Sequence, residues 1–263
     1  MTTNPAKRSR TALRQRSSKP GKKDRVTLDR AFSKSGVLSR NDAIQTIKSG
    51  LVRVNGRVVR DPGTWVSLTQ DKIVCARQVL KPRKKIYLML YKPRGVVTTH
   101  KDPHGRKTVY NLLSETEEWV FPVGRLDKDT SGLLLMTNDT EFGETLTNPR
   151  SKIPKTYQAK VNFRPSEEQL RLLEDGITLK NGEKTLPARV RVIRETEKHA
   201  QLDITIVEGK NRQVRRMIES LDGSVLKLVR RRIGNLSLGN LQIGRYRFLS
   251  NDDLALLWQQ PTD

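Results

Sequence analysis

The chain has 263 residues, enough for one large domain with a small one or for two medium domains. Its 51 lysines and arginines outnumber its 28 aspartates and glutamates, so the formal net charge is +23. This excess favours a polyanionic partner, because each neutralised phosphate releases counterions. A membrane partner is not expected, since no apolar stretch approaches the roughly 20 residues that span a bilayer and no signal-peptide core follows the N-terminus.

Disulfide and metal chemistry have little support in this sequence. Cys75 is the single cysteine, so an internal disulfide is excluded and a cytoplasmic location is expected. The chain has three histidines, and none stands at ligand-like spacing, so we expect no metal site. The chemistry would then come from carboxylates and cations.

Residues 1–25 hold nine lysines or arginines and one acid, Asp24, among small polar residues. Such a segment cannot bury enough apolar surface to offset its ordering entropy. We predict a disordered basic arm that contacts RNA backbone without sequence preference. A solubilising tail and an organellar targeting segment are the alternatives.

Residues 26–76 have the pattern of a compact module with two helices and a hairpin. Apolar residues from Leu28 to Phe32 follow helical spacing, and Gly36 stands where a helix C-cap falls. Ser39 is the predicted N-cap of a second helix. The Asn55-Gly56 pair between strand-like runs is a strong hairpin signal.

Basic side chains surround this module, which predicts a phosphate-binding face, with solvated charges as the alternative. The predicted RNA contacts are Arg40, Lys48, Arg53 and Arg57. The run from Leu38 to Gly56 resembles the S4-type RNA-binding domain, whose helical face grips structured RNA. Such domains occur in proteins of several functions, so the module alone does not define one.

Residues 77–85 are basic and poor in apolar side chains, which predicts a linker. The pattern over 86–258 mixes strands and helices without strict alternation, which favours an α+β fold. Strands are predicted near 86–91, 119–124, 132–137, 156–163, 187–194, 201–207 and 224–232. Helices are predicted near 140–147, 166–174, 211–221 and 252–258.

The segment Gly124–Leu135 places two acids, a base and small hydroxyls in a predicted loop between buried strands. The acids are Asp127 and Asp129, and apolar runs on both sides provide a rigid scaffold. The alternative is a polar turn in which one of these aspartates caps the backbone.

The segment Glu208–Met217 is predicted to begin a helix with Asn211 as N-cap and an apolar stripe behind it. Arg212 and Arg215 are three residues apart, so both could point toward one site. RNA binding is the predicted role of Lys210 and Arg212. A basic exposed helix face is the alternative.

Together these segments resemble the ribosomal RNA pseudouridine synthases that carry an N-terminal S4-type domain. Gly124-Arg125-Leu126-Asp127 with Thr130-Ser131-Gly132-Leu133-Leu134 is similar to the signature loop of that family. Lys155-Thr156-Tyr157 and Glu208–Met217 match two later motifs in order, and Lys92-Pro93-Arg94-Gly95 fits the opening one. One departure is Thr140, where the family often has glycine. The resemblance implies the pseudouridine synthase fold, a mixed and mainly antiparallel sheet flanked by helices.

The resemblance also implies roles for four residues. Asp127 would be the catalytic carboxylate, which attacks the target nucleoside as its glycosidic bond breaks. Tyr157 is similar to the aromatic residue that stacks on the flipped uracil. Arg215 matches the basic residue that pairs with the catalytic aspartate, and Arg125 matches a residue that contacts RNA beside it.

Elementary chemistry agrees with these roles. Moving a base-to-sugar bond from nitrogen to carbon needs no redox or phosphoryl step, so we expect no cofactor. A carboxylate with a reference pKa of about 3.9 is ionised at neutral pH, and a paired Arg215 would keep Asp127 charged when buried. Unstacking the target base has a cost that an aromatic platform partly offsets.

We therefore predict a monomeric enzyme that acts on ribosomal RNA or a pre-ribosomal particle. The sequence Asn211-Arg212-Gln213 favours the large-subunit branch of the family. A non-catalytic RNA-binding or ribosome-assembly protein would share the charge and the N-terminal module. It has no need for Asp127 together with Tyr157 and Arg215. A metal-dependent nuclease would need clustered ligands that the sequence lacks.

Overall fold

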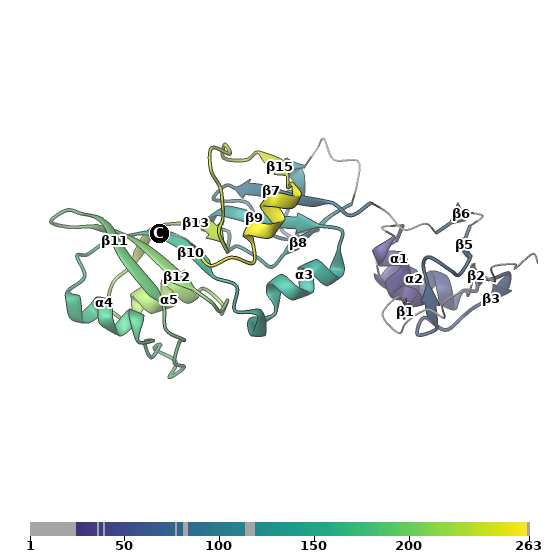
Figure 1. Ribbon diagram of the computed structural model, residues 1–263, viewed down its shortest axis with the longest axis horizontal. Coiled ribbons are helices and arrows are strands. Elements are labelled where there is room, and N and C mark those ends of the chain that lie inside the picture. The colour runs from purple at the N-terminus through teal and green to yellow at the C-terminus, as the bar shows by residue number, and fades with distance from the viewer. Residues whose placement is uncertain are drawn as a thin grey trace, which may run out of the picture. The chain divides into compact units, whose positions relative to one another are not determined.

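The computed structural model describes residues 25–35, 37–38, 40–76, 78–80, 84–113 and 119–261. The chain divides into two compact units, Met1–Pro82 and Arg83–Asp263 (Figure 1). Apart from Arg25, the basic arm at 1–25 lies outside the described residues, as do the two expected helix caps, Gly36 and Ser39.

The first unit packs two helices on small sheets. A four-stranded sheet has the order β3-β2-β5-β6, and β1 pairs with β4. The helices are α1 (Leu28–Lys34) and α2 (Arg40–Lys48). The strands are β1 (Arg25–Thr27), β2 (Val52–Val54), β3 (Arg57–Val58), β4 (Trp65–Ser67), β5 (Ile73–Cys75) and β6 (Gln78–Val79).

The expected hairpin and helical spacing are both present in this unit. Asn55 and Gly56 have positive φ values of 51° and 85°, as a two-residue turn between twisted strands requires. The helices contribute Phe32 and Ile47 to the core, and neither side chain is exposed to solvent. Most polar side chains of both helices remain outside, but Asp29 of α1 is 4% exposed and pairs with Arg40.

The second unit is built on one nine-stranded sheet. Its order is β11-β12-β10-β13-β9-β7-β15, with β14 on β13 and β8 on β9. The strands are β7 (Tyr87–Lys92), β8 (Phe121–Val123), β9 (Ser131–Thr137), β10 (Lys155–Val161), β11 (Arg189–Glu195), β12 (Ala200–Ile206), β13 (Val225–Ile233), β14 (Leu236–Ser237) and β15 (Tyr246–Phe248). The helices are α3 (Thr140–Thr147), α4 (Glu167–Glu174), α5 (Gln213–Glu219) and α6 (Asn251–Leu256), with 3-10 turns η2 (Val109–Leu112) and η3 (Pro149–Ser151). This mixed, mainly antiparallel sheet confirms the α+β fold class.

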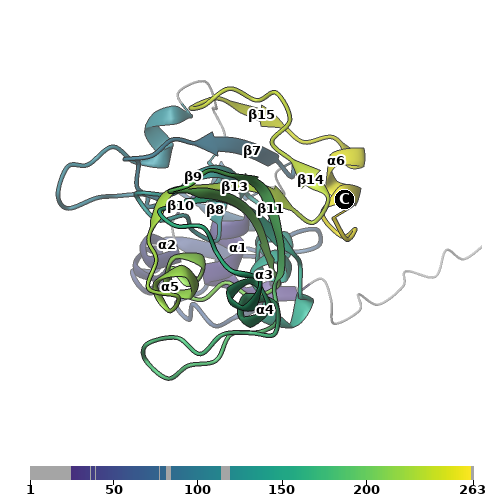
Figure 2. The same cartoon turned by 90° about the vertical axis from the view of Figure 1, so that its left-hand side faces the viewer.

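The alternation of buried and more exposed side chains along the strands decides which face of the sheet the helices cover. On β12 every second residue is buried, and Leu202 and Ile204 pack against Met217 of α5 and Leu173 of α4. Figure 2 shows α4 and α5 together under the curved strands β10 to β13. β9 is buried along its whole length, because it lies centrally and is packed on both faces.

The two halves of the sheet meet where β9 runs beside β13. This is the one parallel ladder between described strands, and it joins Ser131 with Val229 and Gly132 with Arg230. Gly132 has a φ of 124°, and a Cβ there would lie 2.3 Å from the carbonyl oxygen of Arg230. Glycine is therefore required for the backbones to approach so closely at the end of the Gly124–Ser131 loop.

Gly132→Ala is expected to destabilise the second unit by about 3 kcal/mol, since the added methyl group combines backbone strain with a clash against backbone atoms. Urea denaturation measures the change. Gly209→Ala is the matched control, because Gly209 has no left-handed φ and no atom lies within 4 Å of its added Cβ. Equal stability of the two variants would contradict this account of the β9–β13 junction.

The start of α5 differs from the prediction. The helix begins at Gln213, and its N-cap is Arg212, with a left-handed φ of 48°, and not Asn211. The Gln213 side chain accepts from the backbone N–H of Lys210 at 3.1 Å, which provides a capping contact that the sequence pattern did not indicate. As a result, Arg212 is exposed before the helix while Arg215 is buried within it.

Candidate active site

The loop between β8 and β9 carries Asp127 and is fixed by backbone contacts. The N–H of Thr130 donates to the Asp127 carbonyl at 3.1 Å, and the N–H of Gly95 donates to the Lys128 carbonyl at 2.8 Å. The Thr98 hydroxyl donates to the Leu126 carbonyl at 2.9 Å. The segment that follows β7 therefore braces the loop and holds the Asp127 backbone in place.

A cavity of about 600 Å³ opens beside this loop. It brings together five of the residues expected at the site and several that were not singled out. Those expected are Arg125, Asp127, Tyr157, Lys210 and Arg212, and the others include Lys155, Glu208, Gln213 and Arg230. Asp127 and Tyr157 are partly buried, whereas Arg125 and Arg212 are exposed at the surface.

Arg215 does not line the cavity. It connects α5 to the loop between β8 and β9 that carries Asp127. Its guanidinium donates to the Asp129 carbonyl at 3.0 Å and to the Val225 carbonyl at 3.1 Å. Burial lowers the pKa of Arg215, and the negative charges of Asp127 and Asp129 oppose that shift. Both of these hydrogen bonds go to backbone carbonyls, and the described residues show no direct ion pair between Arg215 and Asp127, so the arginine acts on the carboxylate through its charge and through the loop backbone.

Lys92, at the end of β7, is fully buried and places a second cation near the loop. Its ammonium group donates to the carbonyls of Val96 at 2.7 Å and Pro93 at 3.0 Å. Burial lowers its pKa to about 8, against the opposing effect of Asp127 and Asp129. The sequence motif around Lys92 was recognised, but nothing in its spacing indicated that this lysine is buried.

Two further cations line the cavity itself. Arg230 is 4% exposed; its Nε donates to the Leu133 carbonyl at 2.8 Å, while its Nη2 has no hydrogen-bond partner among the described residues. The Lys155 ammonium donates to the Ile153 carbonyl at 3.0 Å, and burial followed by the charge of Arg230 lowers its pKa to about 8. The cavity is thus lined by two cations held by backbone carbonyls, and one nitrogen of the Arg230 guanidinium is left without a hydrogen-bond partner among the described residues.

A polar network also lines the cavity. Glu208 accepts from the Gln213 side chain and from the Leu186 N–H at 2.9 Å. Lys210 pairs with Glu183 at 2.9 Å, and this hydrogen bond raises the lysine's pKa. Lys210 is therefore engaged within the protein, and its contact with RNA stays a prediction.

Comparison with known proteins identifies the family. A family model described as RNA pseudouridylate synthase matches residues 86–220, and an S4 domain model matches residues 27–73. The chain belongs to the RNA pseudouridylate synthase family. The synthase is 41% identical to ribosomal large subunit pseudouridine synthase B of Bacillus subtilis (strain 168), over 88% of this chain and 94% of that one.

Two other relatives agree. An RNA pseudouridine synthase of Aquifex aeolicus (strain VF5) is 37% identical over 89% of this chain and 94% of its own. A crystal structure of a pseudouridylate synthase superposes with a TM-score of 0.64 at 29% identity, covering 88% of this chain and 99% of that chain. The resemblance inferred from the sequence motifs is thereby confirmed.

In the S4 domain of the synthase, the four predicted RNA contacts are all exposed: Arg40, Lys48, Arg53 and Arg57. Two of them also have partners inside the domain. Arg40 pairs with Asp29 at 2.5 Å, and Arg53 donates to the Gly56 carbonyl at 3.0 Å. Their contact with RNA stays a prediction.

In the described part of the synthase, no group of three or more histidine, cysteine, aspartate or glutamate side chains could hold a metal ion. No described helix is long and apolar enough to cross a membrane.

Proposed function

We propose that the synthase isomerises a uridine of large-subunit ribosomal RNA to pseudouridine, with Asp127 as its catalytic carboxylate. The main observation in support of this proposal is that Asp127, Tyr157 and several cations line a single cavity beside a loop whose backbone is held by hydrogen bonds. The relative from Bacillus subtilis, whose name specifies the large ribosomal subunit, supports the choice of RNA. The proposed setting is a monomer in the cytoplasm that acts on ribosomal RNA or a pre-ribosomal particle.

The reaction exchanges one bond for another within the nucleotide. The bond between N1 of uracil and C1′ of the ribose breaks, and a bond between C5 and C1′ forms. The proton on C5 leaves and N1 gains one, so no atom or electron is lost overall. The carboxylate of Asp127 attacks the nucleoside as the first bond breaks, which divides one difficult step into two easier ones.

The rest of the cavity suits a detached, electron-rich uracil. Tyr157 offers an aromatic face on which the flipped base can stack. Arg230 and Lys155 provide positive charge in the same cavity, where burial makes each charge more effective than in water. These cations balance the negative charge that develops on the base and the charge of its phosphate.

The pH dependence of conversion tests the role of Lys155. Its pKa of about 8 means that the ammonium loses its proton as the pH rises through 8, so kcat/KM is expected to fall there. Lys155→Arg keeps the charge and should hold kcat/KM level to higher pH. If kcat/KM of this variant falls at the same pH as in the parent, Lys155 is not the group whose titration lowers the rate. Lys92 would then be the first candidate, because its pKa is also about 8.

The substrate assignment is tested by mapping pseudouridines in ribosomal RNA from cells with and without the gene. We expect one or a few sites in the large-subunit RNA to revert to uridine and the small-subunit pattern to stay unchanged. Loss of a site only in small-subunit RNA, or no loss in either, would overturn the proposal.

A further inference from the structure

The lining of the catalytic cavity contains two buried polar side-chain atoms without a hydrogen-bond partner among the described residues. They are Nη2 of Arg230 and Oγ1 of Thr130, and these residues are 4% and 2% exposed. Buried polar groups of folded proteins are nearly always hydrogen-bonded, because an unpaired group loses its contacts with water and gains nothing in return. Two such atoms in the lining of one cavity point to a ligand that enters it.

Strand pairing fixes where Arg230 lies. It is directly opposite Tyr157 of β10 and beside Gly132 of β9. Opposite residues of an antiparallel pair project to the same face, with Cβ atoms roughly 5 Å apart. Its Nε donates to the Leu133 carbonyl at 2.8 Å, which is the one hydrogen bond that this guanidinium makes with the described residues. Arg230 is therefore held beside the aromatic ring of Tyr157, with N–H donors that remain unused.

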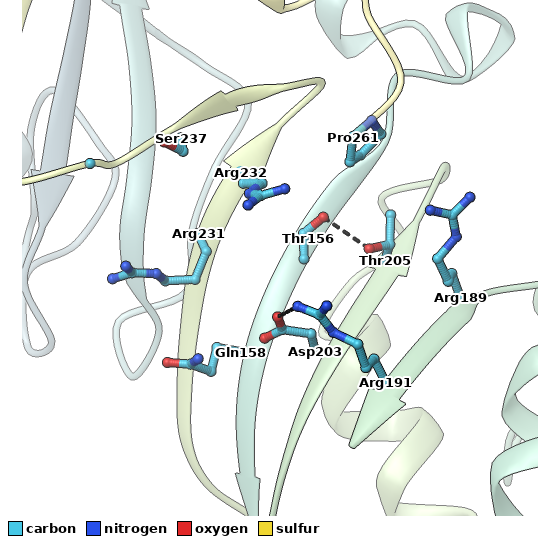
Figure 3. Close-up of a pocket in the computed structure, with 11 residues that line it drawn as sticks. Thr156, Gln158, Arg189, Arg191, Asp203, Thr205, Arg231, Arg232, Ser237 and Pro261 are labelled. Carbon is cyan, nitrogen blue, oxygen red and sulfur yellow. Dashed lines mark hydrogen bonds and ion pairs between the residues drawn. The ribbon is translucent and has the colours of Figure 1, made fainter. Parts of the chain in front are cut away.

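The next two residues of β13 face the other side of the sheet. Figure 3 shows Arg231 and Arg232 around a depression that Thr156 also lines. The pairing register shifts at this point, because Thr156 pairs with Arg232 whereas Tyr157 pairs with Arg230. Of the three consecutive arginines, only Arg230 lines the catalytic cavity.

The depth of Arg230 decides which part of a nucleotide can reach it. Two exposed arginines, Arg125 and Arg212, line the same cavity. A flipped nucleotide stays joined to the RNA strand through its phosphates, so these groups remain near the exposed cations while the base enters deepest. A buried guanidinium beside Tyr157 is placed to meet the base. The ring stacks on the face of the base, and the N–H groups meet its edge.

The reaction itself constrains what a donor at this position meets. The bond to the ribose moves from N1 of uracil to C5, so the detached ring makes a half turn about the axis through N3 and C6. That turn exchanges the two carbonyl groups of the ring. A fixed N–H donor that meets one carbonyl oxygen before the turn therefore meets the other one after it. In cytosine the same turn brings an amino group to the donor in place of a carbonyl, and two donors repel each other.

We propose that Arg230 is a further catalytic residue, which donates a hydrogen bond to a uracil carbonyl oxygen in both orientations of the ring and so restricts the reaction to uridine. The inference rests on the proposed function, since it needs a uracil that detaches and turns. The detached base keeps the electron pair of the broken bond, and its negative charge spreads onto the carbonyl oxygens. A fixed donor in a buried site stabilises such charge without reorganisation. Arg230 therefore acts on the chemical step more than on RNA affinity.

The test measures single-turnover rates at saturating RNA, with an RNA fragment that contains the uridine identified by pseudouridine mapping. Arg230→Gln removes the cation and should lower the rate about 10²-fold, as the loss of one oxyanion-type donor does, with affinity changed by less than about threefold. Arg230→Lys keeps a charged donor and should recover part of this loss.

Arg231→Gln is the matched control. It removes the same charge from the adjacent position of β13, which does not line the catalytic cavity. This variant should convert the fragment at the rate of the parent. A loss equal to that of Arg230→Gln would indicate a general effect of charge and overturn the proposal.

Sulfur substitution in the substrate separates a hydrogen bond from a structural role. Fragments with 2-thiouridine or 4-thiouridine at the target carry sulfur, a weaker acceptor, in place of one carbonyl oxygen. Sulfur also changes the reactivity of the base, so the informative quantity is the ratio of the parent rate to the Arg230→Gln rate for each fragment. We expect this ratio to fall from about 100 with uridine to about 10 with either thio fragment, because the lost interaction is already weakened. If circular dichroism shows that Arg230→Gln does not fold, the ratios are taken with Arg230→Lys, and the same direction is expected.

A ratio that is equal for all three fragments would assign Arg230 a structural role and overturn the proposal. A ratio that falls with only one thio fragment would also overturn it, because the donor would then serve only one orientation of the ring. Conversion by Arg230→Gln at the parent rate would contradict this inference and leave the proposed function intact. If the parent converts no uridine in any RNA, the proposed function fails and this inference fails with it.

Discussion

Asp127→Asn is expected to lower uridine conversion by about 10⁴-fold or more, the range seen when an enzyme loses its nucleophile. The change is nearly isosteric, and the loop that holds residue 127 is fixed by backbone hydrogen bonds that the substitution leaves in place. One negative charge disappears from a cavity that receives a polyanion, so RNA affinity should hold or rise slightly. Tritium release from uridine-labelled RNA measures the first effect, and a gel-shift titration measures the second.

The matched control is Asp129→Asn in the same loop. The Asp129 side chain is 52% exposed and pairs loosely with Arg94 at 3.7 Å, while its backbone carbonyl, which the substitution keeps, holds Arg215. We expect this variant to retain most of its activity. Substantial turnover by Asp127→Asn, or equal losses in the two variants, would remove Asp127 from the catalytic role.

Arg215→Lys is expected to lower the single-turnover rate by about 10²-fold, with little change in affinity. The guanidinium donates at once to two carbonyls, those of Asp129 and Val225, and a single ammonium group cannot replace that fork. The catalytic loop would then lose its connection to α5 and β13. A displacement of Asp127 by about 1 Å is enough to cause a rate loss of this size.

Arg216→Lys is the internal comparison on the same helix. Arg216 pairs with Glu183 at 3.5 Å and is partly exposed, so a lysine can occupy the same position with its charge intact. We expect mild effects on both rate and affinity. Equal effects at 215 and 216 would show instead that α5 is a general RNA-binding face, and Asp127 would need another positioning partner.

The sequence predicted the elements that have a strong pattern. The long apolar runs of β7 and β9 and the alternation in β12 gave boundaries within one or two residues. The short strands β14 and β15 were missed, because strands of two or three residues have too few side chains to show a period and form through pairing with distant neighbours. The N-cap of α5 was misplaced because a left-handed arginine is rarely used there.

For the site, the motifs led to Asp127, Tyr157 and Arg125, and the structure places all three around one cavity. Their roles stay predictions. The contacts of Arg215 could not be predicted, since its partners are backbone carbonyls, and any residue type carries those. The buried, partly unpaired guanidinium of Arg230 could not be predicted either, because Arg230 is one of three consecutive arginines and nothing in the sequence distinguishes it.

The parallel ladder between β9 and β13 has a consequence for how the active site comes into being. It joins distant parts of the chain, and the hydrogen bond from the Ser131 hydroxyl to the Leu228 carbonyl beside it spans 97 residues. The entropic cost of closing this loop is therefore compensated only after both halves of the sheet exist. Asp127 is supplied by one half, and Tyr157 and Arg230 by the other. Neither half alone contains a working site. Long-range pairings of this kind form late in folding. Recovery of activity after denaturation would therefore report the joining of the two halves rather than the earlier appearance of helices and hairpins.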